Sequence, residues 1–386
     1  GWTILGTVTE YRSKQFGERL SVAVNRLWGT ALTQTTPAFC VDIPGTKNVR
    51  YVIPTKNEIN VSLDLEYRKK GLIWYSTYVT KFSGLYVISN NEDVTQKVRF
   101  YFHFPAADAT YDEFSLAIDG KKVFSPIDTR KGICEIVEVE PGGSMSFQVN
   151  YRTRGLDEWR YRLAPSTGRV QNFKLVAKTN FQGVDYPEGS LSPMSALKIG
   201  EGMELTWQAN DLITSQDIGI VVPKRINPGP LASRITFFAP VCLIFFFTLV
   251  AAINVVRKIA IHPMHYLFVA SGFFAFHLLL AYLVDHLDVH LAFVVSAVTS
   301  VVLVTTYLTA ALGERFPAFV AVVGQTFFLV LFSYSFFLEG ATGLTVAIGS
   351  VLTLAILMKV TVHINWHEFF GKEKKEINQA QCQSNP

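Results

Sequence analysis

Two different hydrophobic patterns divide the chain near residue 230. Before that point, apolar and polar side chains alternate in short stretches such as INVSLDLEY at 59–67, VRFYFHF at 98–104 and MSFQVNYR at 145–152. A period of two places alternate side chains on one face, so these stretches predict half-buried strands. PGGS at 141–144 separates ICEIVEVE from MSFQVNYR and predicts a hairpin turn. Many strands separated by turn residues are typical of a β-sandwich.

Beyond residue 230 the alternation stops and long apolar runs follow in close succession. Each run is close to the roughly 20 residues that a helix needs to cross the hydrocarbon core of a bilayer. Only helices and closed barrels satisfy their backbone in lipid, and strict alternation is absent, so helices are predicted. The five runs are Ile235–Val256, Met264–Val284, Val289–Leu312, Phe316–Leu338 and Leu344–Val362.

The N-terminal stretch GWTILG at 1–6 is apolar but too short to span a bilayer. We interpret residues 1–7 as the end of an N-terminal transmembrane helix whose start is missing, with a trimmed soluble N-terminus as the alternative. Residues 8–28 have a helical pattern and would form a stalk. The predicted regions are then 8–230 for the outer β-rich domain, 231–363 for the five-helix domain and 364–386 for a cytoplasmic tail.

Basic residues fall on alternate connectors between the apolar runs, as the positive-inside rule expects. The connectors at 284–290 and 338–343 carry neither Lys nor Arg. The cytoplasmic ends are therefore predicted at 257–263, at 313–316 and at the C-terminus, which leaves residues 8–230 outside. Pro263 suits the first turn of the following helix, and His262 and His265 are interpreted as interfacial. The basic residues are Arg257, Lys258, Arg315, Lys359, Lys372, Lys374 and Lys375, and Trp366 adds an aromatic anchor.

Composition agrees with a membrane protein and disfavours a nucleic-acid binder. The 386 residues are 49% hydrophobic and 17% charged, against roughly 25% charged in an ordinary soluble domain. The net charge is only +4, and the strand-rich half has no dense basic run, so nucleic-acid binding has no support. Together, these patterns predict an α+β membrane protein with an extracytoplasmic β-sandwich-like domain followed by a five-helix transmembrane bundle.

Several ionisable residues lie in or beside the apolar runs. His277 lies deep in the second run, where an ionisable residue is a functional candidate by default, although a neutral histidine can also simply bond a neighbouring helix. The outer connector after the second run carries four possible metal ligands within six residues. This cluster is either a metal site or a polar loop at the membrane surface. These four are Asp285, His286, Asp288 and His290.

The strand-rich half offers few groups for catalysis. Its only histidine, His103, alternates with the apolar face of its stretch and is predicted to face solvent. No GxSxG, Walker or GxGxxG motif occurs, and no cofactor is implied. Cys40 and Cys134 could pair in an oxidising compartment or remain free thiols, since four cysteines are too few for a disulfide scaffold.

Four stretches resemble the CreD family of bacterial inner-membrane proteins, which is linked with envelope integrity and colicin tolerance. They are YRKKGLIWYSTYVTKFSGLYV at 67–87, PGGSMSFQVNYRTRGLDEWRY at 141–161, HPMHYLFVASGFFAFHLLLAYLVDH at 262–286 and INWHEF at 364–369. The His-Pro helix is the most specific of them. The chain departs from the family pattern at Asp285 and at Asn365, and residues 163–230 match that pattern only loosely. The resemblance implies an inner-membrane location and a periplasmic β domain, and it supplies no catalytic residues.

Three functions follow as hypotheses. The first is a non-enzymatic inner-membrane protein whose periplasmic domain binds another envelope component or serves as an accessory subunit, with the bilayer and a protein as partners. The second is an insertase or transporter, which the lack of a cation in the interior of the apolar runs disfavours, since Lys359 lies at the end of the fifth run. The third is a membrane-embedded metalloenzyme that uses the Asp285–His290 loop.

Overall fold

A computed structural model describes residues 1–43, 45, 47–70, 73–163, 168–257, 262–312, 318–338 and 340–362. The chain forms two compact units, which we describe separately. The membrane unit comprises Gly1–Phe16 and Asn227–Pro386, and the β unit comprises Gly17–Ile226. Helix α1, Trp2–Trp28, begins in the first and ends in the second.

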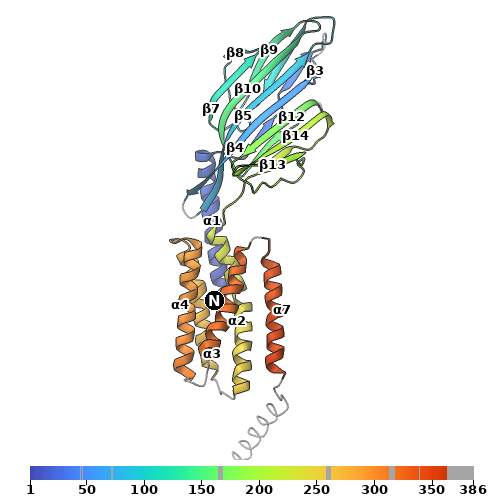
Figure 1. Ribbon diagram of the computed structural model, residues 1–386. Coiled ribbons are helices and arrows are strands. Elements are labelled where there is room, and N and C mark those ends of the chain that lie inside the picture. The colour runs from blue at the N-terminus through green and yellow to red at the C-terminus, as the bar shows by residue number, and fades with distance from the viewer. Residues whose placement is uncertain are drawn as a thin grey trace, which may run out of the picture. The chain divides into compact units, whose positions relative to one another are not determined.

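The β unit is built from three sheets (Figure 1). The largest has eight strands in the order β13-β14-β12-β4-β5-β10-β7-β8; a four-stranded sheet has the order β3-β2-β6-β9, and a three-stranded sheet has the order β1-β11-β15. The strands are β1 Leu32–Thr35, β2 Ala38–Asp42, β3 Val49–Val52, β4 Lys56–Lys70, β5 Ile73–Ser89, β6 Gln96–Phe102, β7 Tyr111–Ile118, β8 Lys121–Val123, β9 Ile133–Val139, β10 Ser144–Leu156, β11 Glu158–Arg162, β12 Arg169–Thr179, β13 Ser195–Ile199, β14 Gly202–Ile213 and β15 Ile218–Val221.

Period-two alternation explains where the core of the β unit lies. Phe39 of β2 and Phe100 of β6 belong to the four-stranded sheet, and their rings pack on Phe147 of β10 with centroids 5.0 and 4.9 Å apart. All three side chains are buried. The inner faces of the two larger sheets therefore meet through aromatic side chains, each of which buries about 150–250 Å².

The strand prediction is confirmed for the three alternating stretches, which lie in β4, β6 and β10, except that β6 ends at Phe102 and leaves the last two residues of the 98–104 stretch outside it. The hairpin prediction at 141–144 is wrong. β9 pairs with β6, whereas β10 pairs with β5 and β7, so the turn links two different sheets. The turn instead bonds Asn90, whose backbone N donates to the Gly143 carbonyl at 2.9 Å and whose carbonyl accepts from the Gly142 N at 2.9 Å. Turn residues in the sequence indicate that the chain reverses direction. The strand with which each neighbouring strand pairs depends on contacts with more distant segments.

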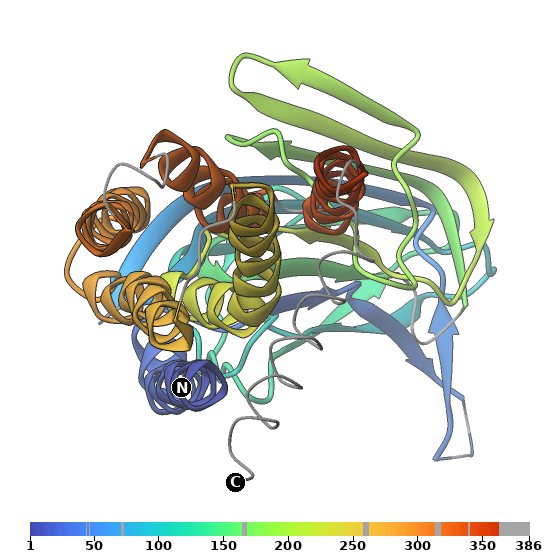
Figure 2. The ribbon, with the colours of Figure 1, turned by 90° about the horizontal axis from the view of Figure 1, so that it is seen from below.

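The membrane unit contains the predicted apolar helices, which Figure 2 shows end-on. Among the described residues, five segments are long and apolar enough to cross a membrane. The fourth is a succession of α, π and 3-10 turns rather than one uniform α-helix. The elements are α2 Pro228–Arg257, α3 Pro263–Leu283, α4 Val289–Leu312, α5 Ala318–Gln325, the π-helix η2 Thr326–Leu331, α6 Phe332–Tyr334, the 3-10 helix η3 Ser335–Phe337 and α7 Thr342–Thr361.

Small residues allow the helices of the membrane unit to approach closely. A Cβ on Gly272 of α3 would lie 2.3 Å from Cγ2 of Val304 on α4, so only glycine fits between these helices. Pro263 occupies the first turn of α3 as predicted, and the His262 side chain caps this helix by accepting from the Met264 N. The α7 segment packs differently from the others. Only 6% of its apolar 18-residue stretch is buried, against 39–44% of the corresponding stretch in each of the other four segments.

Candidate functional site

An ion pair connects the N-terminal helix to the end of α3. The Arg12 guanidinium on α1 donates to the Asp285 carboxylate, and their side chains are 36% and 18% exposed. The same guanidinium lies 5.4 Å from the ring centroid of Tyr282, which adds a cation–π contact. The loop residue Asp285, singled out from sequence, is therefore held by a cation that lies 273 positions earlier in the chain.

His277 lies fully buried on α3, and both of its hydrogen-bond contacts among the described residues involve Nδ1. Its Nδ1 is 2.9 Å from the Phe273 carbonyl oxygen and 3.3 Å from Nε1 of Trp2 on α1. Because Nδ1 either donates or accepts, one neutral tautomer satisfies only one of these two contacts. Nε2 is buried and has no hydrogen-bond partner among the described residues. The histidine thus joins α1 to α3 and leaves one polar atom unsatisfied.

A second buried polar group in the membrane unit was not predicted from sequence. Ser300 on α4 donates to the Gly272 carbonyl at 2.7 Å and accepts from Nε2 of Gln325 at 3.0 Å. Both side chains are fully buried, and the π-helix η2 begins directly after Gln325. Oε1 of Gln325 has no partner among the described residues. Serine and glutamine are uncharged, so a search for ionisable residues passes over them.

Two substitutions distinguish the roles within this polar group. We expect Ser300→Ala to lower the free energy of unfolding by about 1–2 kcal/mol, because it leaves Nε2 of Gln325 buried without an acceptor. Gln325→Leu removes the amide with its unsatisfied oxygen and leaves the Ser300 bond to Gly272 intact, so we expect it to be neutral or stabilising. Thermal unfolding of both variants in lipid nanodiscs measures the difference. A larger loss for Gln325→Leu than for Ser300→Ala would contradict this assignment.

Two of the other three residues of the predicted metal loop, Asp288 and His290, make local contacts. Oδ1 of Asp288 accepts from the backbone N of His290 at 2.9 Å, and the His290 ring stacks on Phe337 at 4.9 Å. No hydrogen bond of the His286 side chain occurs among the described residues. No three His, Cys, Asp or Glu side chains come together as a metal site in the described part of the chain. The metalloenzyme hypothesis therefore gains no support from this loop.

The topology anchors are only partly within the described residues. Arg257 is exposed at the last turn of α2, whereas Lys258, Arg315 and Trp366 lie outside the described residues. His265, interpreted as interfacial, has its Nδ1 2.8 Å from the Tyr307 hydroxyl on α4. This contact ties the start of α3 to α4.

Cys40 and Cys134 are free thiols in the β unit. β6 lies between them, since Cys40 of β2 pairs with Arg99 and Cys134 of β9 pairs with Tyr101. The two cysteines are therefore separated by two strand spacings, or about 9–10 Å. A disulfide tolerates at most roughly 7 Å between the Cα atoms of its cysteines. The pairing considered from sequence is therefore not formed here. Burial raises the pKa of the Cys40 thiol, whereas Cys134 is exposed.

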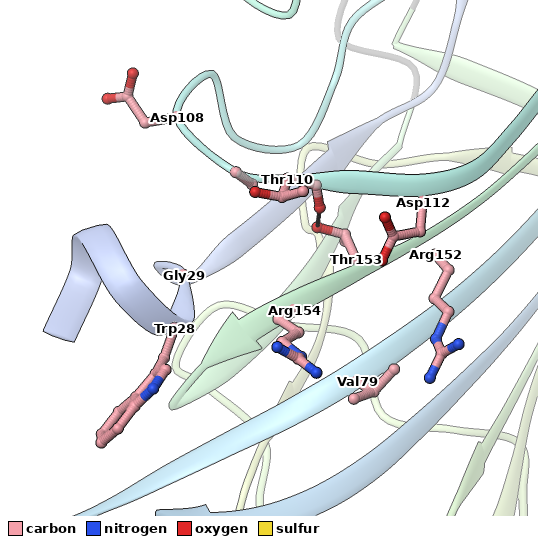
Figure 3. Close-up of a pocket in the computed structure, with 10 residues that line it drawn as sticks. Trp28, Gly29, Val79, Asp108, Thr110, Asp112, Arg152, Thr153 and Arg154 are labelled. Atoms are coloured by element: carbon pink, nitrogen blue, oxygen red, sulfur yellow. Dashed lines mark hydrogen bonds between the residues drawn. The ribbon is translucent and has the colours of Figure 1, made fainter. Parts of the chain in front are cut away.

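The β unit also contains a polar cavity of ≈ 270 Å³ (Figure 3). Its wall is formed by the end of α1, by the 108–110 loop and by strands β5, β7 and β10. Thr153 of β10 is buried beneath it and donates to the Thr110 carbonyl at 2.8 Å. The charged residues that line the cavity are Asp108, Asp112, Arg152 and Arg154. The residues of this cavity come from separate segments of the chain, so no local sequence pattern predicts it.

Comparisons with known proteins support the membrane assignment. Residues 196–367 match the family described as Inner membrane protein CreD, so the resemblance is confirmed over this segment. No curated protein matches the chain. A proposed nutrient-binding protein from Legionella pneumophila subsp. pneumophila str. Philadelphia 1 is 13% identical with a TM-score of 0.30, covering 64% of this chain and 84% of that one. A two-domain M1 zinc metallopeptidase bound to L-arginine is 8% identical with a TM-score of 0.25, covering 45% and 42%.

Proposed function

We propose that this chain, which matches the CreD family over residues 196–367, is a non-enzymatic inner-membrane protein whose β unit, a sandwich of sheets, lies in the periplasm. There it binds another envelope component or acts as an accessory subunit of a membrane complex. In this arrangement the C-terminus and the connectors after α2 and α4 face the cytoplasm. The proposal rests on the alternate placement of basic residues along the chain and on the family match.

The observation that carries the non-enzymatic role is the engagement of the candidate ionisable groups in structural contacts. Asp285 pairs with Arg12, and His290 stacks on Phe337. Nδ1 of His277 lies beside a backbone carbonyl of its own helix. Nδ1 of His277 also lies 3.3 Å from Nε1 of Trp2 on α1. Asp285, His290 and His277 therefore each contact another helix, which is the common role of polar side chains between transmembrane helices.

The native cysteines provide a test of the orientation. A maleimide that cannot cross membranes, added to intact spheroplasts, should label the exposed Cys134 of the β unit and spare Cys382 of the C-terminal tail. Cys40 and Cys242 are buried, and the raised pKa of Cys40 lowers its thiolate fraction and hence its reactivity. Mass spectrometry of the labelled peptides gives the result for each cysteine.

Two single variants serve as controls for this labelling. Cys134→Ser should abolish labelling in intact spheroplasts, whereas Cys382→Ser should leave it unchanged. After lysis, Cys382 of the unsubstituted protein should become reactive. Labelling of Cys382 but not Cys134 before lysis would place the β unit in the cytoplasm and overturn the proposed orientation.

The role in a complex requires a separate experiment. A photo-crosslinking amino acid at Val351, a 68% exposed position of the weakly packed α7, should capture one partner in stoichiometric amount. The same amino acid at Val302 of α4, 56% exposed, serves as a matched lipid-facing control. Capture of many different nascent membrane proteins at both positions would instead support the insertase hypothesis.

A further inference from the structure

The cavity of the β unit has walls that the backbone fixes in place. Gly29 follows α1 with φ +99°, and a Cβ there would lie 2.4 Å from the Arg154 carbonyl oxygen. The Leu156 N donates to the Thr30 carbonyl at 3.1 Å, which ties this segment to the end of β10. On the other side, the pairing of β10 with β7 shifts register between Asn150 and Arg152. Such bulges occur often beside functional sites, where they redirect side chains.

Two arginines of β10 lie at the cavity on the same face of the sheet. Arg152 and Arg154 are two residues apart, so both side chains leave the strand toward one side, as Figure 3 shows. Arg152 is only loosely held, with its Nη1 3.6 Å from Oε1 of the 70% exposed Glu113. Lys81 of β5 lies opposite Arg152 in register and adds to the positive charge of this face. This side of the cavity attracts an anionic group.

An opposite charge lines the same cavity and is left unpaired. Asp112 of β7 is the register partner of Arg152, yet among the described residues Asp112 has neither an ion pair nor a hydrogen bond. The same holds for the Arg154 side chain. Asp112 and Arg154 are both exposed, so their charges are hydrated rather than paired with each other, and they line one cavity of ≈ 270 Å³ in which a ligand can replace that water. A ligand that carries both charges would satisfy both groups.

We propose that this cavity binds a small zwitterion. Its carboxylate or phosphoryl group contacts the Arg154 guanidinium, supported by Arg152, and its ammonium group contacts the Asp112 carboxylate. The cavity volume of ≈ 270 Å³ is just below the roughly 300–1,000 Å³ found for pockets of drug-sized ligands, which suits a ligand smaller than these. A short peptide with free termini and a phosphoethanolamine headgroup both have this chemistry. The inference goes beyond the proposed function and holds on whichever side of the membrane the β unit lies.

Calorimetric titration of the full chain in lipid nanodiscs tests the proposal. The probes are alanyl-alanine, glycerophosphoethanolamine, and acetate and methylammonium as single charges. We expect one zwitterion to bind at least about tenfold more tightly than either single charge, since each lone ion leaves one protein charge unpaired. Tighter binding of the dipeptide identifies a peptide as the source, and tighter binding of the phosphoester identifies a lipid headgroup.

Matched variants decide whether binding occurs at this cavity. Arg154→Gln and Asp112→Asn should each weaken binding of the preferred zwitterion by about tenfold or more. Arg50→Gln, which removes an exposed guanidinium of β3 from its pair with Glu92, should leave it unchanged. Circular dichroism checks the fold of each variant, and the Asp112→Asn result stands if Arg154→Gln does not fold. The absence of binding by either zwitterion up to about 10 mM, or equal binding by acetate, would overturn the proposal.

Discussion

Gly29→Ala is expected to lower the free energy of unfolding of the β unit by about 3 kcal/mol or more. The residue has φ +99°, a region in which a residue with a Cβ is strained by about 1–3 kcal/mol. In addition, the new Cβ would lie 2.4 Å from the Arg154 carbonyl oxygen. A backbone carbonyl cannot swing aside as a flexible side chain can, so α1 and β10 must separate. Hydrogen exchange should show lost protection at the Leu156 amide, which donates to Thr30.

A second glycine separates the two causes of this loss. Gly120, in the turn between β7 and β8, has φ +72° and nothing within 4 Å of an added Cβ. Gly120→Ala therefore carries only the conformational strain, and we expect a loss of about 1–2 kcal/mol. Equal losses for the two variants in thermal unfolding would show that the approach of Gly29 to β10 does not stabilise the β unit.

Local patterns in the sequence were sufficient to predict the elements. Alternation placed Ile59, Val61 and Leu63 on one face of a strand, and all three are at most 3% exposed in the structure. Length and apolar content likewise predicted the helical segments. The partner of each strand could not be predicted, because pairing depends on contacts between distant segments. The turn at 141–144 therefore predicted a reversal correctly but the wrong neighbour.

The candidate sites were harder to predict, because their residues come together only in the fold. Asp285 and His277 stood out as ionisable residues near apolar runs, but nothing in the sequence linked them to Arg12 or Trp2. Gln325 had no charge to mark it, although it is completely buried. The period of a pattern indicates which face is buried. It does not identify the polar groups from other elements that meet there.

Exchange of the charges of Arg12 and Asp285 is expected to restore most of what the single substitutions remove. Arg12→Asp and Asp285→Arg each place two like charges together and should lower the free energy of unfolding of the membrane unit by about 2–3 kcal/mol. This is below the roughly 3–5 kcal/mol for breaking a fully buried pair, because the side chains are 36% and 18% exposed and solvent screens part of the interaction. The double variant R12D/D285R should recover more than half.

The recovery should be incomplete, since the exchange moves the guanidinium away from the Tyr282 ring and a cation–π contact is worth about 0.5–1 kcal/mol at an exposed site. A neighbouring pair on the same helix supplies the control. Glu10 and Lys14 lie four residues apart with side chains 43% and 72% exposed, so Glu10→Gln should change stability by less than about 0.5 kcal/mol. Thermal unfolding in lipid nanodiscs gives all four values. If R12D/D285R is as unstable as the sum of the two single variants, this pair does not join α1 to the end of α3, and the attachment of the N-terminal helix must be sought at Trp2 and His277 instead.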